Sequence, residues 1–155
     1  MRSIIFYLTI ALFSNCGSQS PEKFKNQKHI EIQYEALSRG FFENILVSEA
    51  GIHLRTDRNN ALQTFYKISK KDWQTCLDLL GELNLEDLPT LKAPTSKRFY
   101  DGAAHAVLSI EIDGQKTTTP SFDHEHPPKT IKDLTAHVLE LKKQCISKNK
   151  NGQKF

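Results

Sequence analysis

The sequence predicts a single α+β domain: an antiparallel sheet of about five to six strands with two helices packed on one face. Short runs in which apolar and polar residues alternate, as in half-buried strands, fill much of residues 29–68 and 104–122. Two further runs have apolar residues every three or four positions, at residues 70–83 and 130–147. This spacing is typical of helices that bury one stripe against a sheet.

Four strands are predicted in the first part of the domain, at residues 29–37, 41–48, 52–56 and 62–68. In the first of them Ile30, Ile32 and Tyr34 alternate with polar residues, so one face is expected to be buried and the other to meet solvent. Gly40 and Gly51 lie in the breaks between the first three strands, as expected for turns.

Ser69 precedes the first predicted helix and Asp72 follows three residues later, which is the pattern of a capping box. The second helix is predicted to begin at Thr130, as its N-cap, after an extended Pro127-Pro128 segment. Each helix has one apolar stripe, formed by Trp73, Cys76, Leu77, Leu80 and Leu83 in the first and by Ile131, Leu134, Val138, Leu141 and Cys145 in the second.

Asp113-Gly114 stands between two β-rich runs and predicts a two-residue hairpin turn, because such turns need a positive φ at both central residues. The resulting register places four pairs opposite one another: Ile112 and Gln115, Glu111 and Lys116, Ser109 and Thr118, His105 and Phe122. The opposite charges of the second pair support this register.

The chain has 155 residues and a formal net charge of +3, with acidic and basic residues mixed throughout. This length is expected to form one domain. Because there is no basic stripe interleaved with aromatic residues, nucleic acid is not an expected partner.

Residues 1–15 are predicted to be a signal peptide, since the apolar run at 4–13 is too short for a membrane span of about 20 residues. Cys16 follows directly, so the segment resembles the lipobox of bacterial lipoprotein precursors, with Phe13 and Asn15 as departures from the usual pattern. The resemblance implies lipid attachment at Cys16 and, because no Asp follows it, an outer-membrane location facing the periplasm or the surface. The alternative is an ordinary secretory signal.

The expected organisation is a signal peptide at 1–15, a lipidated cysteine and tether at 16–28, the domain at 29–147 and a polar tail at 148–155. Export would place Cys76 and Cys145 in an oxidising compartment, where a disulfide between the two helices is one alternative. Two buried free thiols are the other alternative.

The ends of the hairpin contain the densest group of polar side chains. Arg98 and Asp101 precede it, and Asp123, His124 and His126 follow it. An ion pair that orders the loops is one interpretation of these residues, and a recognition surface is the other. A metal site would need His105 to join His124 and His126, as imidazole nitrogens suit zinc or copper.

For catalysis the sequence gives little support. Ser96, Ser109 and Ser121 lack the glycine context of a nucleophile elbow, and no glycine-rich phosphate loop is present. We therefore expect no catalytic residues and no cofactor.

Two family resemblances follow from these motifs. Pro94-Thr95, Arg98 and Asp101-Gly102-Ala103 before a strand, with Phe122-Asp123-His124 and Pro127-Pro128 after its partner, resemble a pattern of small lipoproteins that suggests no function. The layout also resembles emfourin-like inhibitors of thermolysin-type metalloproteases. Residues 38–42 stand where that family has a Gly-Gly-Phe turn, with Arg39 in place of a glycine. This second resemblance implies inhibition by insertion of the turn into an active-site cleft.

The sequence thus predicts a membrane-anchored bacterial lipoprotein whose domain binds an envelope protein without catalysis. A metalloprotease inhibitor and a metal-binding envelope protein are the alternatives. The predicted binding surface consists of Arg39, Phe41, Phe42, Arg98, Asp101, Asp123, His124 and His126.

Overall fold

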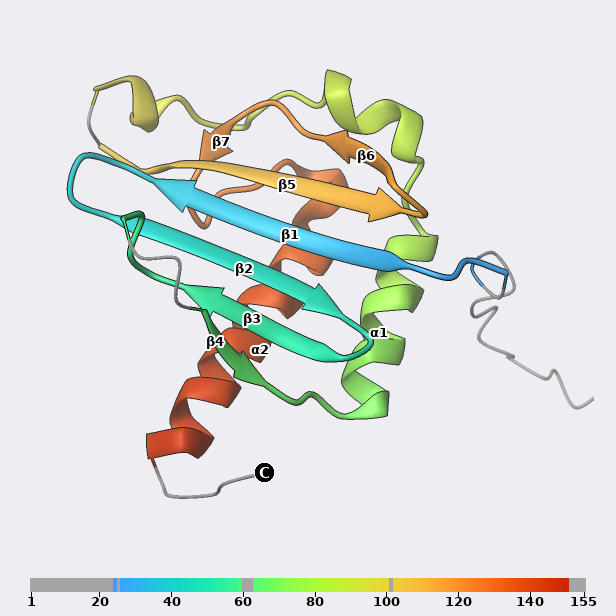
Figure 1. The fold of residues 1–155 in the computed structure, drawn as a ribbon. Helices are drawn as coiled ribbons and strands as arrows, with labels where there is room; N and C mark the ends of the chain where they lie inside the picture. Colours follow the sequence, from blue (N-terminus) through green and yellow to red (C-terminus); the bar gives the residue numbers. More distant parts are fainter. Residues whose placement is uncertain (1–23, 25, 60–62, 101, 151–155) are drawn as a thin grey trace, which may run out of the picture.

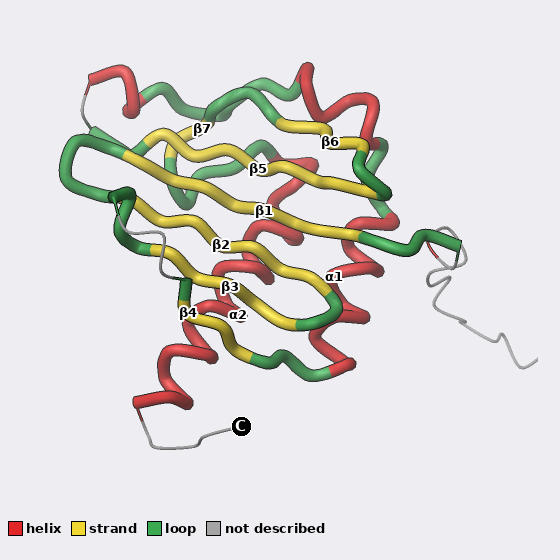
Figure 2. The backbone as a smooth tube through the Cα atoms, viewed as in Figure 1, coloured by secondary structure: helices red, strands yellow, loops and turns green. Residues whose placement is uncertain are grey.

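The computed structural model describes residues 24, 26–59, 63–100 and 102–150. The fold is α+β, as predicted, with an antiparallel sheet in front and helices behind one of its faces (Figures 1 and 2). The strands are β1 (Ile30–Leu37), β2 (Phe42–Ser48), β3 (Gly51–Arg55), β4 (Thr64–Tyr66), β5 (His105–Ile112), β6 (Gln115–Thr118) and β7 (Phe122–Asp123). The helices are α1 (Lys70–Gly81) and α2 (Lys132–Lys150), with short 3-10 helices η2 (Leu85–Thr90), η3 (Lys97–Tyr100) and η4 (Lys129–Ile131).

The strand order is β4-β3-β2-β1-β5-β6, and β7 pairs with β5 beside β6. Alternate residues of the central strand β1 point toward the helices, and Ile32, Tyr34 and Ala36 are fully buried there. Tyr34 lies between Ile45 of β2 and Leu108 of β5 in the register. Apolar side chains from three strands thus form one layer beneath α1 and α2.

The capping box of α1 is confirmed, because the Asp72 N–H donates to Ser69 Oγ (3.0 Å) and the Ser69 N–H donates to Asp72 Oδ2 (3.4 Å). The stripe predicted for the second helix is also buried at all five residues, of which Ile131 lies in η4 and the other four lie in α2. The predicted cap at Thr130 is wrong. Pro128 occupies the N-cap of η4 without a side-chain hydrogen bond, and α2 begins only after η4.

The hairpin register is confirmed for the three pairs nearest the turn. The fourth predicted pair is wrong by one residue, because His105 faces Asp123, and Phe122 faces Ala106. Thr119 still pairs with Leu108, whose N–H donates to Thr119 Oγ1 (3.1 Å). After this pair, the two residues Pro120 and Ser121 stand opposite a single residue of β5. This insertion shifts the register and turns Phe122 into the core.

Cys76 and Cys145 are both buried and both free. Burial raises the pKa of the Cys76 thiol to about 12, with a smaller contribution from Asp72, and burial also raises the pKa of Cys145. The structure therefore agrees with the alternative of two buried thiols that act as small apolar side chains.

The predicted signal peptide and Cys16 lie outside the described residues. Phe24, which belongs to the segment predicted as a tether, is buried in the core cluster and lies near Gly81 at the end of α1. Among the described residues, no helix is long and apolar enough to cross a membrane.

Candidate functional site

Two turns lie at the end of the sheet where β1 finishes (Figure 1). In the β1–β2 turn, the Ser38 N–H donates to the Phe41 carbonyl oxygen (2.8 Å), which leaves Arg39 and Gly40 exposed at its tip. Phe41 is 40% exposed, and its ring centroid lies 5.1 Å from that of His124 in the second turn. We call Arg39, Phe41, His124, Glu125 and His126 the turn surface.

The second turn begins where β7 ends. The His126 N–H donates to the Asp123 carbonyl oxygen (2.8 Å), and Glu125 has a φ of 65° at the third position of this turn. A positive φ at that position is the mark of a type II turn and is usually supplied by glycine or asparagine. The His124 N–H donates to the Ala104 carbonyl oxygen (2.9 Å), so the turn is fixed to the chain just before β5.

Tyr34 connects the turn surface to the core. Its hydroxyl lies 2.7 Å from His124 Nδ1 and 3.4 Å from the Glu125 backbone nitrogen. Because the hydroxyl accepts the Glu125 N–H, its own proton is free to be donated to Nδ1. We therefore assign the proton of His124 to Nε2, which makes this ring nitrogen a donor toward the surface.

Burial controls the protonation of both rings. It raises the pKa of Tyr34 well above its ordinary value, against the effect of the Glu125 backbone hydrogen bond. It lowers the pKa of His124 below 6.5, against the opposing effects of Glu125 and Glu43. Both side chains are thus held neutral near pH 7, which agrees with the hydrogen-bond assignment.

Asp123 lies beneath the turn surface and is fully buried. Its Oδ2 accepts hydrogen bonds from Thr95 Oγ1 (2.6 Å) and the Lys97 N–H (2.8 Å). Its Oδ1 accepts from the backbone N–H and the side chain of Arg98, both at 3.0 Å. Burial alone would raise the pKa of Asp123, but these hydrogen bonds outweigh it and hold the pKa well below the ordinary value.

Arg98 is buried as well, and it completes this network. It donates to the Thr95 carbonyl oxygen (2.7 Å) and to Ser121 Oγ (3.2 Å), while its guanidinium carbon lies 4.2 Å from the centroid of the Phe99 ring. The prediction that Arg98 and Asp123 lie on the binding surface is therefore wrong. Their charges satisfy one another and fix η3 to β7, which is the loop-ordering role.

Two other residues that the sequence singled out, Phe42 and His105, are not on the turn surface. Phe42 belongs to β2 and lies on the sheet face away from the helices, where the guanidinium carbon of Arg55 is 5.0 Å from its ring centroid. Asp101 lies outside the described residues. His105 packs edge-on against Phe99 at a centroid separation of 6.0 Å, so the structure does not bring it together with His124 and His126.

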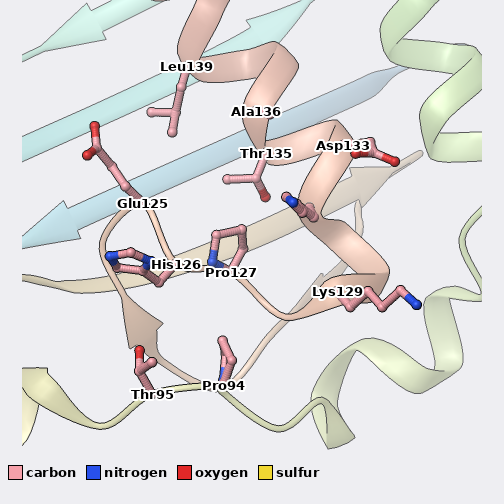
Figure 3. Close-up of a pocket in the computed structure, with 11 residues that line it drawn as sticks. Pro94, Thr95, Glu125, His126, Pro127, Lys129, Asp133, Thr135, Ala136 and Leu139 are labelled. Atoms are coloured by element: carbon pink, nitrogen blue, oxygen red, sulfur yellow. The ribbon is translucent and has the colours of Figure 1, made fainter.

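A groove of about 690 Å³ adjoins the turn surface and shares Glu125 and His126 with it (Figure 3). Its remaining lining residues are Pro94, Thr95, Pro127, Lys129, Lys132, Asp133, Thr135, Ala136 and Leu139. In Figure 3, Glu125 and Leu139 lie on one side of the groove, and Pro94 and Thr95 lie on the other. The hydroxyl of Thr135 is buried and has no hydrogen-bond partner among the described residues.

No local pattern in the sequence predicts this groove. Its walls come from residues 94–95, 125–127 and 129–139, which only the fold brings together. Pro94-Thr95, His126 and Pro127-Pro128 each belong to a sequence motif, but these motifs indicate a family resemblance, a polar recognition surface and a helix start, and not a cavity.

Comparisons with known proteins found no matching family model, no matching curated protein and no matching solved structure. The likenesses to small lipoproteins and to emfourin-like inhibitors therefore remain predictions from the sequence.

Proposed function

We propose that this protein is a membrane-anchored bacterial lipoprotein of the cell envelope, and that its domain binds another envelope protein without catalysing a reaction. The observation that supports this proposal best is the continuous site formed by the turn surface and the groove, which share Glu125 and His126. In the proposal, lipid on Cys16 holds the protein at the bilayer, as the lipobox-like sequence suggests.

The direction of β1 favours this arrangement. The chain enters β1 at Ile30 and reaches the turn surface after Leu37, at the opposite end of the sheet (Figure 1). A strand of this length spans roughly 26 Å at about 3.3 Å per residue. A tether attached before β1 would therefore hold the membrane at one end of the domain and present the turn surface at the other.

The turn surface is also held in one conformation before any partner arrives. Phe41 rests on His124, His124 is hydrogen-bonded to the buried Tyr34, and Asp123 is fixed by four hydrogen bonds. Preorganised contacts lose less conformational entropy on binding. The surface offers an aromatic ring, an Nε2–H donor and charges of both signs, and the groove adds apolar walls, a mixture found at protein interfaces.

The protonation states support binding more than catalysis. Burial raises the pKa values of the Tyr34 hydroxyl and the Cys76 thiol, which makes both weak nucleophiles near pH 7. The Asp123 carboxylate is saturated by hydrogen bonds and is not available as a base.

The test is capture of partners from detergent-solubilised envelope by the full chain. We compare the wild-type protein with Phe41→Ala and His126→Ala, and we use Phe65→Ala as the matched control because Phe65 is similarly exposed (44%) but lies on β4. One stoichiometric protein that is lost with Phe41→Ala and retained with Phe65→Ala supports the proposal. A partner that is lost only with Phe65→Ala, or no partner at all, refutes it.

A second candidate function is inhibition of a thermolysin-like metalloprotease. The specific observation in its favour is the β1–β2 turn, which is closed by a hydrogen bond and presents Phe41 on a rigid support. An inhibitory loop needs this combination of exposure and rigidity. Titration of thermolysin with the wild-type protein should then show inhibition that Phe41→Ala weakens and Phe65→Ala does not. Undiminished peptidase activity at a large excess of the protein removes this candidate.

A further inference from the structure

A group of potential metal ligands lies at the other end of β1 from the turn surface. His29, Glu31 and Glu111 each offer one nitrogen or oxygen atom, and these three atoms lie within 4.8 Å of one another. Among the described residues, no other group of three or more histidine, cysteine and acidic side chains meets this distance. His29 Nε2 and Glu31 Oε1 are 3.2 Å apart, close to the separation of about 3.4 Å between two ligands of a tetrahedral zinc ion.

The backbone holds all three residues in place. Glu31 of β1 and Glu111 of β5 are directly opposite in the register, on the sheet face away from the helices. The His29 N–H donates to Asp113 Oδ1 (2.9 Å), and the Asp113 N–H donates to the His29 carbonyl oxygen (2.9 Å). The β5–β6 turn therefore fixes the histidine beside the two carboxylates, on the two central strands of the sheet.

Two side chains of like charge, Glu31 and Glu111, are directly opposite each other in this cluster. Like charges that face each other directly across two strands destabilise a sheet. Lys116 is opposite Glu111 in the hairpin, but its Nζ donates to Gln33 Oε1 (2.8 Å). Two carboxylates thus face each other with a histidine as their neighbour, and a bound cation would offset their repulsion.

We propose that His29, Glu31 and Glu111 bind a divalent transition-metal ion of the zinc class. One imidazole nitrogen and two carboxylate oxygens form a donor set that suits zinc, whereas magnesium and calcium prefer oxygen ligands alone. The His29 and Glu31 side chains are 56% and 27% exposed, so an ion has access from solvent and keeps positions for water or a further ligand. This site is separate from the turn surface, and it does not depend on the proposed function.

The test uses the full chain purified in detergent and freed of metal with a chelator. Isothermal titration with Zn²⁺ alone measures affinity for the wild-type protein, Glu111→Gln and His29→Ala. Glu125→Gln is the matched control, because His124 and Glu125 form a similar pair (3.9 Å) that no third potential ligand among the described residues completes. Thermal melts with and without Zn²⁺ provide a second measurement.

We expect one zinc ion per chain, with affinity weakened at least about tenfold by Glu111→Gln or His29→Ala and unchanged by Glu125→Gln. Zinc should also raise the melting temperature of the wild-type protein and not that of Glu111→Gln. Without metal, Glu111→Gln should melt at the same temperature as the wild type or higher, because it removes the repulsion between the two carboxylates. Zinc binding that survives both ligand substitutions, or no binding at millimolar zinc, overturns the proposal.

Discussion

The ion pair between Lys142 of α2 and Glu43 of β2 provides the sharpest test of how the helix that lines the groove is attached to the sheet. Lys142 Nζ lies 2.6 Å from Glu43 Oε1, and the two side chains are only 17% and 7% exposed. The second carboxylate oxygen, Oε2, is buried without a hydrogen-bond partner among the described residues. The lysine is therefore the main compensation for a buried negative charge.

Substitution Lys142→Met keeps most of the aliphatic side chain and removes the charge. Breaking a fully buried ion pair on one side costs roughly 3–5 kcal/mol. Because Lys142 is partly exposed and water can reach the vacated position, we expect a loss of about 2–3 kcal/mol in the free energy of unfolding. With a urea m-value of about 1.5 kcal/mol per molar, the midpoint should fall by roughly 1.3–2 M.

The double substitution Glu43→Leu with Lys142→Met should return the stability to within about 1 kcal/mol of the wild type, or above it, since both desolvated charges are gone. Lys143→Met is the control, because Lys143 is the exposed neighbour of Lys142 on the same helix. Urea unfolding followed by circular dichroism gives all four values. A cost below about 0.5 kcal/mol for Lys142→Met would show that the pair behaves as a solvated surface pair and would refute this reasoning.

Three further predictions concern side chains that are partly or fully buried. Because burial lowers the pKa of His124 below 6.5, the unfolded chain takes up this proton first. Stability is therefore complete above pH 6.5 and falls as the pH drops below it, and His124→Asn should flatten urea midpoints measured between pH 7.5 and 5.5. Thr119→Val leaves the Leu108 N–H unpaired and should cost about 1–3 kcal/mol in urea unfolding, whereas Thr119→Ser should cost clearly less. Cys76 and Cys145 should resist alkylation in the native protein and react in urea without prior reduction, and mass spectrometry that shows a need for reductant would contradict free thiols.

Local patterns were enough to predict most of the fold. Strand alternation, the capping box at Ser69 and the Asp113-Gly114 turn all depend on residues that are near one another in sequence. The predicted hairpin register is wrong only beyond Thr119. There the Thr119 side-chain oxygen replaces a backbone carbonyl as the acceptor, and the segment that follows contains one residue more than the strand opposite it. Alternation of polar and apolar residues contains no information on such an insertion.

The candidate site was less predictable, because burial of polar groups depends on distant partners. Arg98 and Asp123 have the composition of a surface site, yet the fold buries them against each other and against Thr95. Tyr34 was assigned to the core from its place in β1, and that assignment is correct for its ring. The hydrogen bond from its hydroxyl to His124, 90 residues away, has no sequence signal.

The two edges of the sheet bear on how this protein behaves at high concentration. β4, at one edge, has three residues, and the other edge is divided between β6 and β7 by Pro120, which has no N–H to donate. η2 lies beside β6, and the hydrogen bonds of Asp123 fix η3 to β7 (Figure 1). Short, interrupted or covered edges resist the strand addition that joins one sheet to the next. Concentrated chains should therefore stay separate rather than join edge to edge through their sheets.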